Sequence, residues 1–267
     1  MSDYKFPLNQ SFKHQLVSLL SEALQHDVKD VMSIYKLDFF NSVHFLTWDF
    51  IYTRVYKNVQ DESKICIKCK RGPWSFVLMY DLKEKYLYSF MKEKRLAQLI
   101  DERNRRSSIH YADALVTLNK NITELGLDLS NVEQQLDLLP LEEDSDWEKS
   151  IEKILKDMLG IHYGGIKNYV VVTFSHHRGE IESVNATLLS PSMDVVYKEN
   201  WDEFINVEYE KNDNIPDTWN LDEDEDDGDS IVKLKWHLDE EEETADDLDD
   251  IARRKDEKPG EEEKDQG

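Results

Sequence analysis

The chain has only two cysteines among 267 residues, too few to build a disulfide framework. It also has no apolar run that approaches the roughly 18 to 20 residues of a membrane-spanning helix. Glycine and proline are scarce, with 9 and 6 residues, so the chain is not a low-complexity or fibrous sequence. Residues 1–7 do not show the basic segment and apolar stretch of a secretory signal. We therefore expect a cytoplasmic protein that is neither secreted nor embedded in a membrane.

Familiar catalytic motifs are missing as well. Gly164 and Gly165 have neither the Lys-Ser/Thr end nor the glycine spacing of a phosphate-binding loop. The histidines have no serine or cysteine nucleophile placed at a sharp strand-to-helix turn. Cys66 and Cys69 have the spacing of a zinc or redox pair, but no second pair of ligands accompanies them. They lie in an alternating segment that directs them to opposite faces, so we expect ordinary sheet residues, no metal and no cofactor.

Hydrophobic periodicity predicts the fold. Helical spacing covers residues 12–24, with Ser11 as the expected N-cap, and continues through the aromatic-rich segment 27–56. Those aromatic residues are interpreted as core, with ligand stacking as the alternative. Further helices are expected over residues 92–106 and 147–159, and strands over two meanders. The strands are expected at 64–70, 74–81, 86–91, 170–174, 181–189 and 195–197.

This order predicts the α+β class, with one antiparallel sheet of about six strands and helices on one face. Residues 1–220 form the expected globular body, with 1–118 and 147–220 as subdomains if it divides. Residues 221–267 hold 22 Asp and Glu against 7 Lys and Arg. Beyond Asp239 this tail has too little apolar content to fold alone, so we expect it to be disordered.

One short segment of the tail differs from its surroundings. Val232, Leu234, Trp236 and Leu238 alternate with polar residues, which predicts a strand at 231–238. This strand either completes the protein's own sheet or pairs with the sheet edge of a partner.

The opposite charge is concentrated in residues 54–106, which hold 14 Lys and Arg against 7 Asp and Glu. Basic side chains interleaved with an aromatic ring suit a phosphate backbone, whereas the alternative is a solvated helix surface. The candidate nucleic-acid-binding residues are Lys68, Lys70, Arg71, Trp74, Lys92, Lys94, Arg95, Arg103, Arg105 and Arg106.

A catalytic alternative rests on Asp81 and Lys83, which follow an apolar strand. An acid two residues before a lysine occurs in metal-dependent nucleases, where the carboxylate binds Mg²⁺ and Asp61 or Asp49 would complete the site. The same residues are typical of a hairpin turn, and the sequence does not predict the strand-helix-strand unit that such a site needs.

Three segments carry a resemblance to a known family. Residues 71–76, 88–95 and 109–111 read RGPWSF, YSFMKEKR and IHY, and they resemble the core pattern of a family of uncharacterised bacterial proteins also found on phages and mobile elements. The resemblance covers about the first half of the chain. It implies a bacterial cytoplasm and a role in phage–host conflict, and it assigns no catalytic residue.

Together these observations predict a non-enzymatic interaction protein. We expect it to bind nucleic acid, or a protein that handles nucleic acid, through the basic window, with the acidic tail tuning the contact. One alternative is an inhibitor whose carboxylates mimic DNA in the basic groove of an enzyme, and another is the Mg²⁺-dependent nuclease.

The charge separation predicts that the tail competes with external polyanions. Residues 239–267 hold 15 acidic and 5 basic side chains, and tethering keeps them at a local concentration on the order of millimolar. Truncation after Leu238 should therefore strengthen DNA or RNA binding at low salt, measured by fluorescence anisotropy. The gain should fade as salt shortens the electrostatic reach to about 10 Å at 0.1 M. A truncated protein that binds no polyanion at about 50 mM salt would favour the DNA-mimic hypothesis instead.

Overall fold

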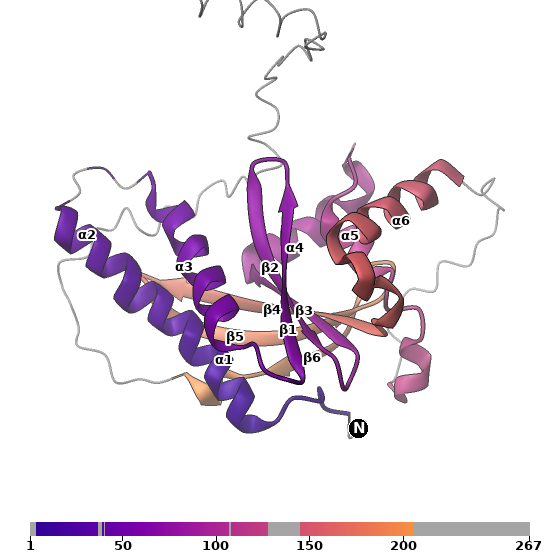
Figure 1. The fold of residues 1–267 in the computed structure, drawn as a ribbon, viewed down its shortest axis with the longest axis horizontal. Helices are drawn as coiled ribbons and strands as arrows, with labels where there is room; N and C mark the ends of the chain where they lie inside the picture. The colour runs from indigo at the N-terminus through magenta and orange to yellow at the C-terminus, as the bar shows by residue number, and fades with distance from the viewer. Residues whose placement is uncertain (1–3, 37–38, 40, 107, 128–144, 206–267) are drawn as a thin grey trace, which may run out of the picture. The chain divides into compact units, whose positions relative to one another are not determined.

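A single six-stranded sheet organises the part of the chain that the structure describes (Figure 1). The structure is a computed structural model that describes residues 4–36, 39, 41–106, 108–127 and 145–205. The strands lie in sequence order and are β1 (Lys64–Arg71), β2 (Trp74–Asp81), β3 (Tyr86–Lys92), β4 (Asn168–His177), β5 (Glu180–Leu189) and β6 (Val195–Asn200). The α+β class, the six strands and the two meanders are confirmed.

Two tight turns set the register of the meanders. Gly72 has a φ of 55° and, with Pro73, closes the β1–β2 hairpin directly after the Arg71–Trp74 pair. A positive φ at the first of two loop residues matches the strand twist, and glycine adopts it without strain. At the β4–β5 hairpin both Arg178 and Gly179 have a positive φ, as a two-residue turn of the mirror-image type requires.

The antiparallel sheet that the sequence predicts contains one parallel pair, at its centre. β3 and β4 are parallel, in register from the Tyr86–Asn168 pair to the Lys92–Phe174 pair. Parallel neighbours need a long crossover connection, which residues 93–167 provide. This connection contains α4 (Glu93–Glu102), α5 (Tyr111–Val116) and α6 (Ser145–Leu159). Segments 1–118 and 147–220 therefore contribute strands to the same sheet.

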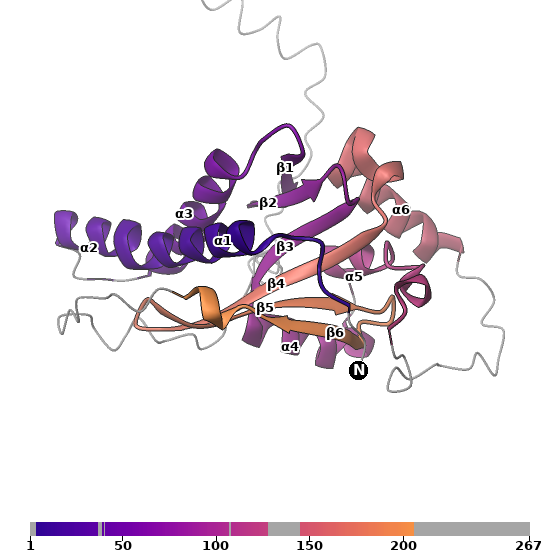
Figure 2. The ribbon, with the colours of Figure 1, turned by 90° about the horizontal axis from the view of Figure 1, so that it is seen from below.

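Helices cover both faces of the sheet, not one as the sequence analysis expected. Figure 2 shows α1 (Gln10–Glu22) and α3 (Val43–Asn58) on one side and α4 on the other. The reason is the apolar character of the central strands, since every residue of β3 is buried. A strand buried on both faces must be covered on both.

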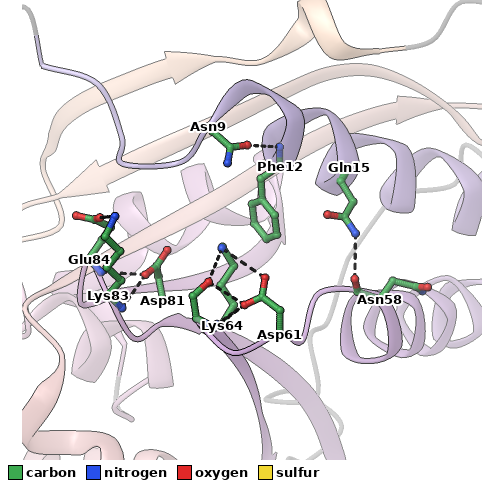
Figure 3. Close-up of polar contacts among 10 residues, drawn as sticks. Asn9, Phe12, Gln15, Asn58, Asp61, Lys64, Asp81, Lys83 and Glu84 are labelled. Carbon is green, nitrogen blue, oxygen red and sulfur yellow. Dashed lines mark hydrogen bonds and ion pairs between the residues drawn. The ribbon is translucent and has the colours of Figure 1, made fainter.

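The N-terminal helical region begins earlier than expected. The N-cap is Asn9 and not Ser11, because the Asn9 side-chain oxygen accepts the Phe12 backbone N–H at 2.8 Å (Figure 3). After α1 the helix continues as a π-helical segment, η1 (Ala23–Val28), and then as α2 (Lys29–Tyr35). The expected helix 92–106 is also shorter, because α4 ends at Glu102 and a 3₁₀ turn follows.

Asn119 fastens the crossover connection to the sheet. Its side chain is fully buried and donates to the carbonyl oxygens of Tyr169 and Leu189 at 2.9 and 2.8 Å. It also accepts the Tyr169 backbone N–H at 2.6 Å. One amide group thus satisfies three backbone groups of β4 and β5, which would otherwise be buried without partners.

The tail predictions lie outside the described residues, including the strand 231–238 and the whole of 221–267. Within the described part, no helix combines the length and the apolar character needed to cross a membrane.

Replacing Asn119 with alanine should destabilise the fold strongly. The substitution leaves three buried backbone groups unpaired, and each costs about 1–3 kcal/mol, so we expect a loss of roughly 3 kcal/mol or more in the free energy of unfolding. Urea denaturation of Asn119→Ala measures the loss, and Asn121→Ala is the control because the Asn121 side chain is exposed. Equal stabilities of the two variants would contradict the role assigned to Asn119.

Candidate nucleic-acid interface

A cavity of about 460 Å³ lies between α3 and the β1–β2 hairpin. Its helical wall is built from residues spaced three, four, seven and eight positions apart, which places them on one face of α3. These residues are Asp49, Tyr52, Thr53, Tyr56 and Lys57.

The other wall consists of three consecutive cross-strand pairs of β1 and β2, of which Cys69 with Phe76 is the middle one. Lys68 pairs with Val77 and Lys70 with Ser75 in the antiparallel register of β1 and β2. Directly opposed residues share a face of the sheet, so both lysines belong to the face that α3 covers. The short hairpin turn fixes this register and therefore fixes the positions at which the two lysine side chains leave the strand.

The cavity lining is rich in positive charge. Lys57, Lys68 and Lys70 are exposed, and Asp49 is the acid among the lining residues. No carboxylate of the described residues forms an ion pair with any of the three lysines. The Lys68 ammonium nitrogen lies 4.0 Å from the centroid of the Tyr56 ring, a cation–π contact. An anion that carries an aromatic or apolar group suits such a lining.

Contacts outside the cavity hold α3 in place. Arg54 forms ion pairs with Glu22 of α1 and with Asp27 of η1, and hydrogen bonding to Asp27 raises the pKa of its guanidinium group. The buried Trp48 ring stacks on Tyr52 at a centroid distance of 5.2 Å and meets Phe174 of β4 edge to face at 5.7 Å. These contacts fix the helix, so the polar face towards the cavity is preorganised.

The predicted basic residues do not share one side of the sheet. Lys68 and Lys70 face α3, whereas Arg71, Arg95 and Arg106 lie near the buried His110 beyond the opposite face. Burial and these three guanidinium charges lower the pKa of His110 well below its usual range. His110 is thus neutral at pH 7, and its Nδ1 accepts the Ala112 backbone N–H at 3.1 Å.

Arg103, Arg105 and Arg106 contact protein groups, as Arg95 does through a hydrogen bond to Gln98 at 2.9 Å. Arg103 donates to the Pro191 carbonyl oxygen at 2.8 Å, and burial lowers its pKa. Arg106 forms an ion pair with Asp113, whose carboxylate also accepts the His110 backbone N–H. Arg105 is exposed and pairs with Asp101 on the same helical stretch. Arg103 therefore joins the crossover connection to the β5–β6 turn, and Arg106 joins two parts of the connection, which leaves less of their hydrogen-bonding capacity for a ligand.

The remaining predicted residues have varied environments. Trp74 is half-buried, and its ring packs against Phe45 and Trp48 of α3, so it contributes to the packing of the helix. Lys92 and Arg95 are buried, with 9% and 8% of their surface exposed, at the junction of β3 and α4. Lys94 is exposed on the first turn of α4.

The nuclease candidates occupy turns at the end of the sheet away from the β1–β2 hairpin. Asp81 Oδ1 accepts the backbone N–H groups of Lys83 and Glu84 at 3.0 and 2.9 Å, so it caps the β2–β3 turn (Figure 3). Lys83 is exposed and pairs with Glu84, and Asp61 caps the turn before β1 in a similar way. No cluster of three or more potential ligands occurs within the described ranges.

The sequence alone does not identify several residues of the cavity. Lys57, Thr53 and Ser75 were not singled out, and Asp49 was considered only as a nuclease carboxylate. The spacing of residues 49–57 was an available signal, because polar residues recur there on one face of an otherwise apolar helix. The facing strand could not be paired with this helix from the sequence alone.

The chain belongs to a family of unknown function (DUF5986), whose model matches residues 5–252. The match covers more of the chain than the first half, where the sequence analysis placed the family resemblance. No curated protein and no solved structure matches the chain.

Both cysteines should be chemically inert in the native protein. Cys66 Sγ lies 3.8 Å from the Val55 carbonyl oxygen of α3, and Cys69 Sγ lies 3.5 Å from that of Met158 in α6, so the thiols lie on opposite faces as predicted. Burial raises the pKa of Cys66 to about 11 and that of Cys69 to about 12. The reactive thiolate is therefore scarce at neutral pH.

We expect Cys66→Ser combined with Cys69→Ser to leave the metal content unchanged and to cost about 1 kcal/mol of stability. Elemental analysis measures the metal content. In the wild type, alkylation of the two cysteines by iodoacetamide should be slow until the protein is denatured. Stoichiometric zinc that disappears in the double variant would overturn this expectation.

Proposed function

We propose that the protein binds nucleic acid without catalysing its cleavage, through the cavity between α3 and the β1–β2 hairpin. The observation that supports this most is the set of three exposed lysines beside two tyrosines, with one acid among the lining residues. Lysine ammonium groups bind phosphate as point charges, and aromatic rings accept stacked bases. Of the basic window 54–106, Lys57, Lys68 and Lys70 carry the proposal.

The wider setting is part of the proposal. Family membership assigns no activity, so a bacterial cytoplasm and a role in phage–host conflict rest on the sequence resemblance alone. In this setting the acidic tail would compete for the lysines and tune the contact. A protein that handles nucleic acid is the other partner in keeping with the charge separation.

Salt-dependent binding tests the proposal. Each phosphate contact contributes about 0.7 to the slope of log affinity against log salt for a single strand. Lys68→Ala combined with Lys70→Ala should therefore weaken oligonucleotide binding and reduce the slope by about 1.4. Fluorescence anisotropy between roughly 50 and 200 mM salt measures both quantities.

A matched control removes two other exposed lysines. Lys120→Ala combined with Lys167→Ala has the same net charge, and Lys167 lies beside the β2–β3 turn, at the end of the sheet away from Lys70. The control should leave the slope unchanged. Equal losses in the two variants would show that net charge and not the cavity drives binding. Mg²⁺-dependent cleavage would favour the nuclease alternative, and affinity for a basic protein but not for DNA would favour the mimic.

A further inference from the structure

We infer that the cavity holds one unpaired nucleobase together with its phosphate, so that the protein selects single strands over duplexes. This inference rests on the proposed function and specifies its ligand. The cavity is about 460 Å³, within the range of about 300–1,000 Å³ typical of small-molecule sites. A base in a duplex is stacked and paired and would have to be flipped out of the helix to enter.

The length of the helical wall matches a nucleotide rather than a bare anion. Asp49 and Lys57 are eight residues apart on α3, which corresponds to about 12 Å along the helix axis. A simple phosphate would need only the ammonium groups, and the tyrosines and the carboxylate would then serve no purpose in binding. A ligand with a planar ring, hydrogen-bond donors and a negative charge uses all three kinds of group.

Tyr56 provides the aromatic contact. Its ring is half-buried and is oriented by the Lys68 ammonium group at 4.0 Å. Tyr52 is buried deeper and is fixed by its stacking on Trp48. Base–aromatic stacking tolerates every base, because each has a π-face, so Tyr56 should contribute affinity without specificity.

Asp49 provides the specificity. A carboxylate on the wall accepts hydrogen bonds but repels phosphate, so its presence among three lysines is unfavourable for a purely electrostatic site. A carboxylate accepts well from the exocyclic amino group of cytosine, whereas thymine has a carbonyl oxygen at that position. We therefore expect cytosine to be preferred over thymine.

The experiment uses the full chain and fluorescence anisotropy with three DNA probes of equal length, namely oligo-dC, oligo-dT and a mixed-sequence duplex, at pH 7.5. The wild type should bind oligo-dC at least tenfold more tightly than the duplex. Tyr56→Ala should reduce single-strand affinity about tenfold and leave duplex affinity unchanged, whereas Tyr56→Phe should retain the wild-type preference. Tyr35→Ala is the matched control, because Tyr35 is exposed on α2, away from the cavity lining.

The variant Asp49→Asn tests whether Asp49 recognises cytosine or only repels phosphate. Loss of the negative charge should raise affinity for all three probes. The amide can accept from cytosine but can also donate to the carbonyl oxygen of thymine, so the ratio of oligo-dC to oligo-dT affinity should fall towards one. An Asp49 that only repels phosphate would give equal gains and an unchanged ratio, which would overturn its assigned role. Circular dichroism verifies that each variant is folded.

The outcomes distinguish this inference from the proposed function. Equal affinity for single strands and duplexes, with no selective effect of Tyr56→Ala, would refute the base pocket and leave nucleic-acid binding intact. No binding to any probe would refute the proposed function itself. A further titration uses dCMP, which should bind far more weakly than oligo-dC. Equal affinities would show that the cavity serves a free nucleotide and not a strand.

Discussion

The parallel pairing of β3 with β4 is the constraint on which the rest of the described structure depends. It joins two local meanders into one sheet and makes the central strands inaccessible from either face. Both faces must then be covered, so α1 and α3 pack on one and the crossover helices on the other. The Asn119 side chain supports this junction, because it pairs with both the N–H and the carbonyl oxygen of Tyr169, near the start of β4.

The two covered faces use basic residues differently. On the crossover side, arginines are partly buried and hydrogen-bonded, as Arg103 is to Pro191 and Arg106 to Asp113. A planar guanidinium group with five donors suits such fixed contacts. On the α3 side, Lys68 and Lys70 extend from β1 into solvent. A flexible, strongly hydrated ammonium group costs more to bury and remains available to a mobile anion. One basic stretch of sequence thus supplies scaffold on one face and a candidate binding surface on the other.

Local periodicity predicted most of the elements, and it failed where distant segments meet. The alternation in residues 64–70 and the turn at Gly72 were sufficient for the first meander. The direction of β4 relative to β3 depends on a connection of 75 residues, whose path no local pattern encodes. The cavity could not be predicted from local patterns for the same reason. Its lysines on β1 and its tyrosines on α3 become one site only after the helix packs on the sheet. The N-cap was misplaced by two residues for a smaller reason, since Asn9 and Ser11 are both good capping residues.

Edge protection offers a simpler explanation for some of these lysines. β1 is an edge strand, and lysines on an edge oppose pairing with another chain. This explanation accounts for Lys68 and Lys70, but it predicts nothing about the helix opposite them. Lys57, Tyr56 and Asp49 belong to α3, which has no strand edge to protect, and they face the same cavity. The cavity combines charge from both walls with the rings and the acceptor of α3, and this combination distinguishes it from a protected edge.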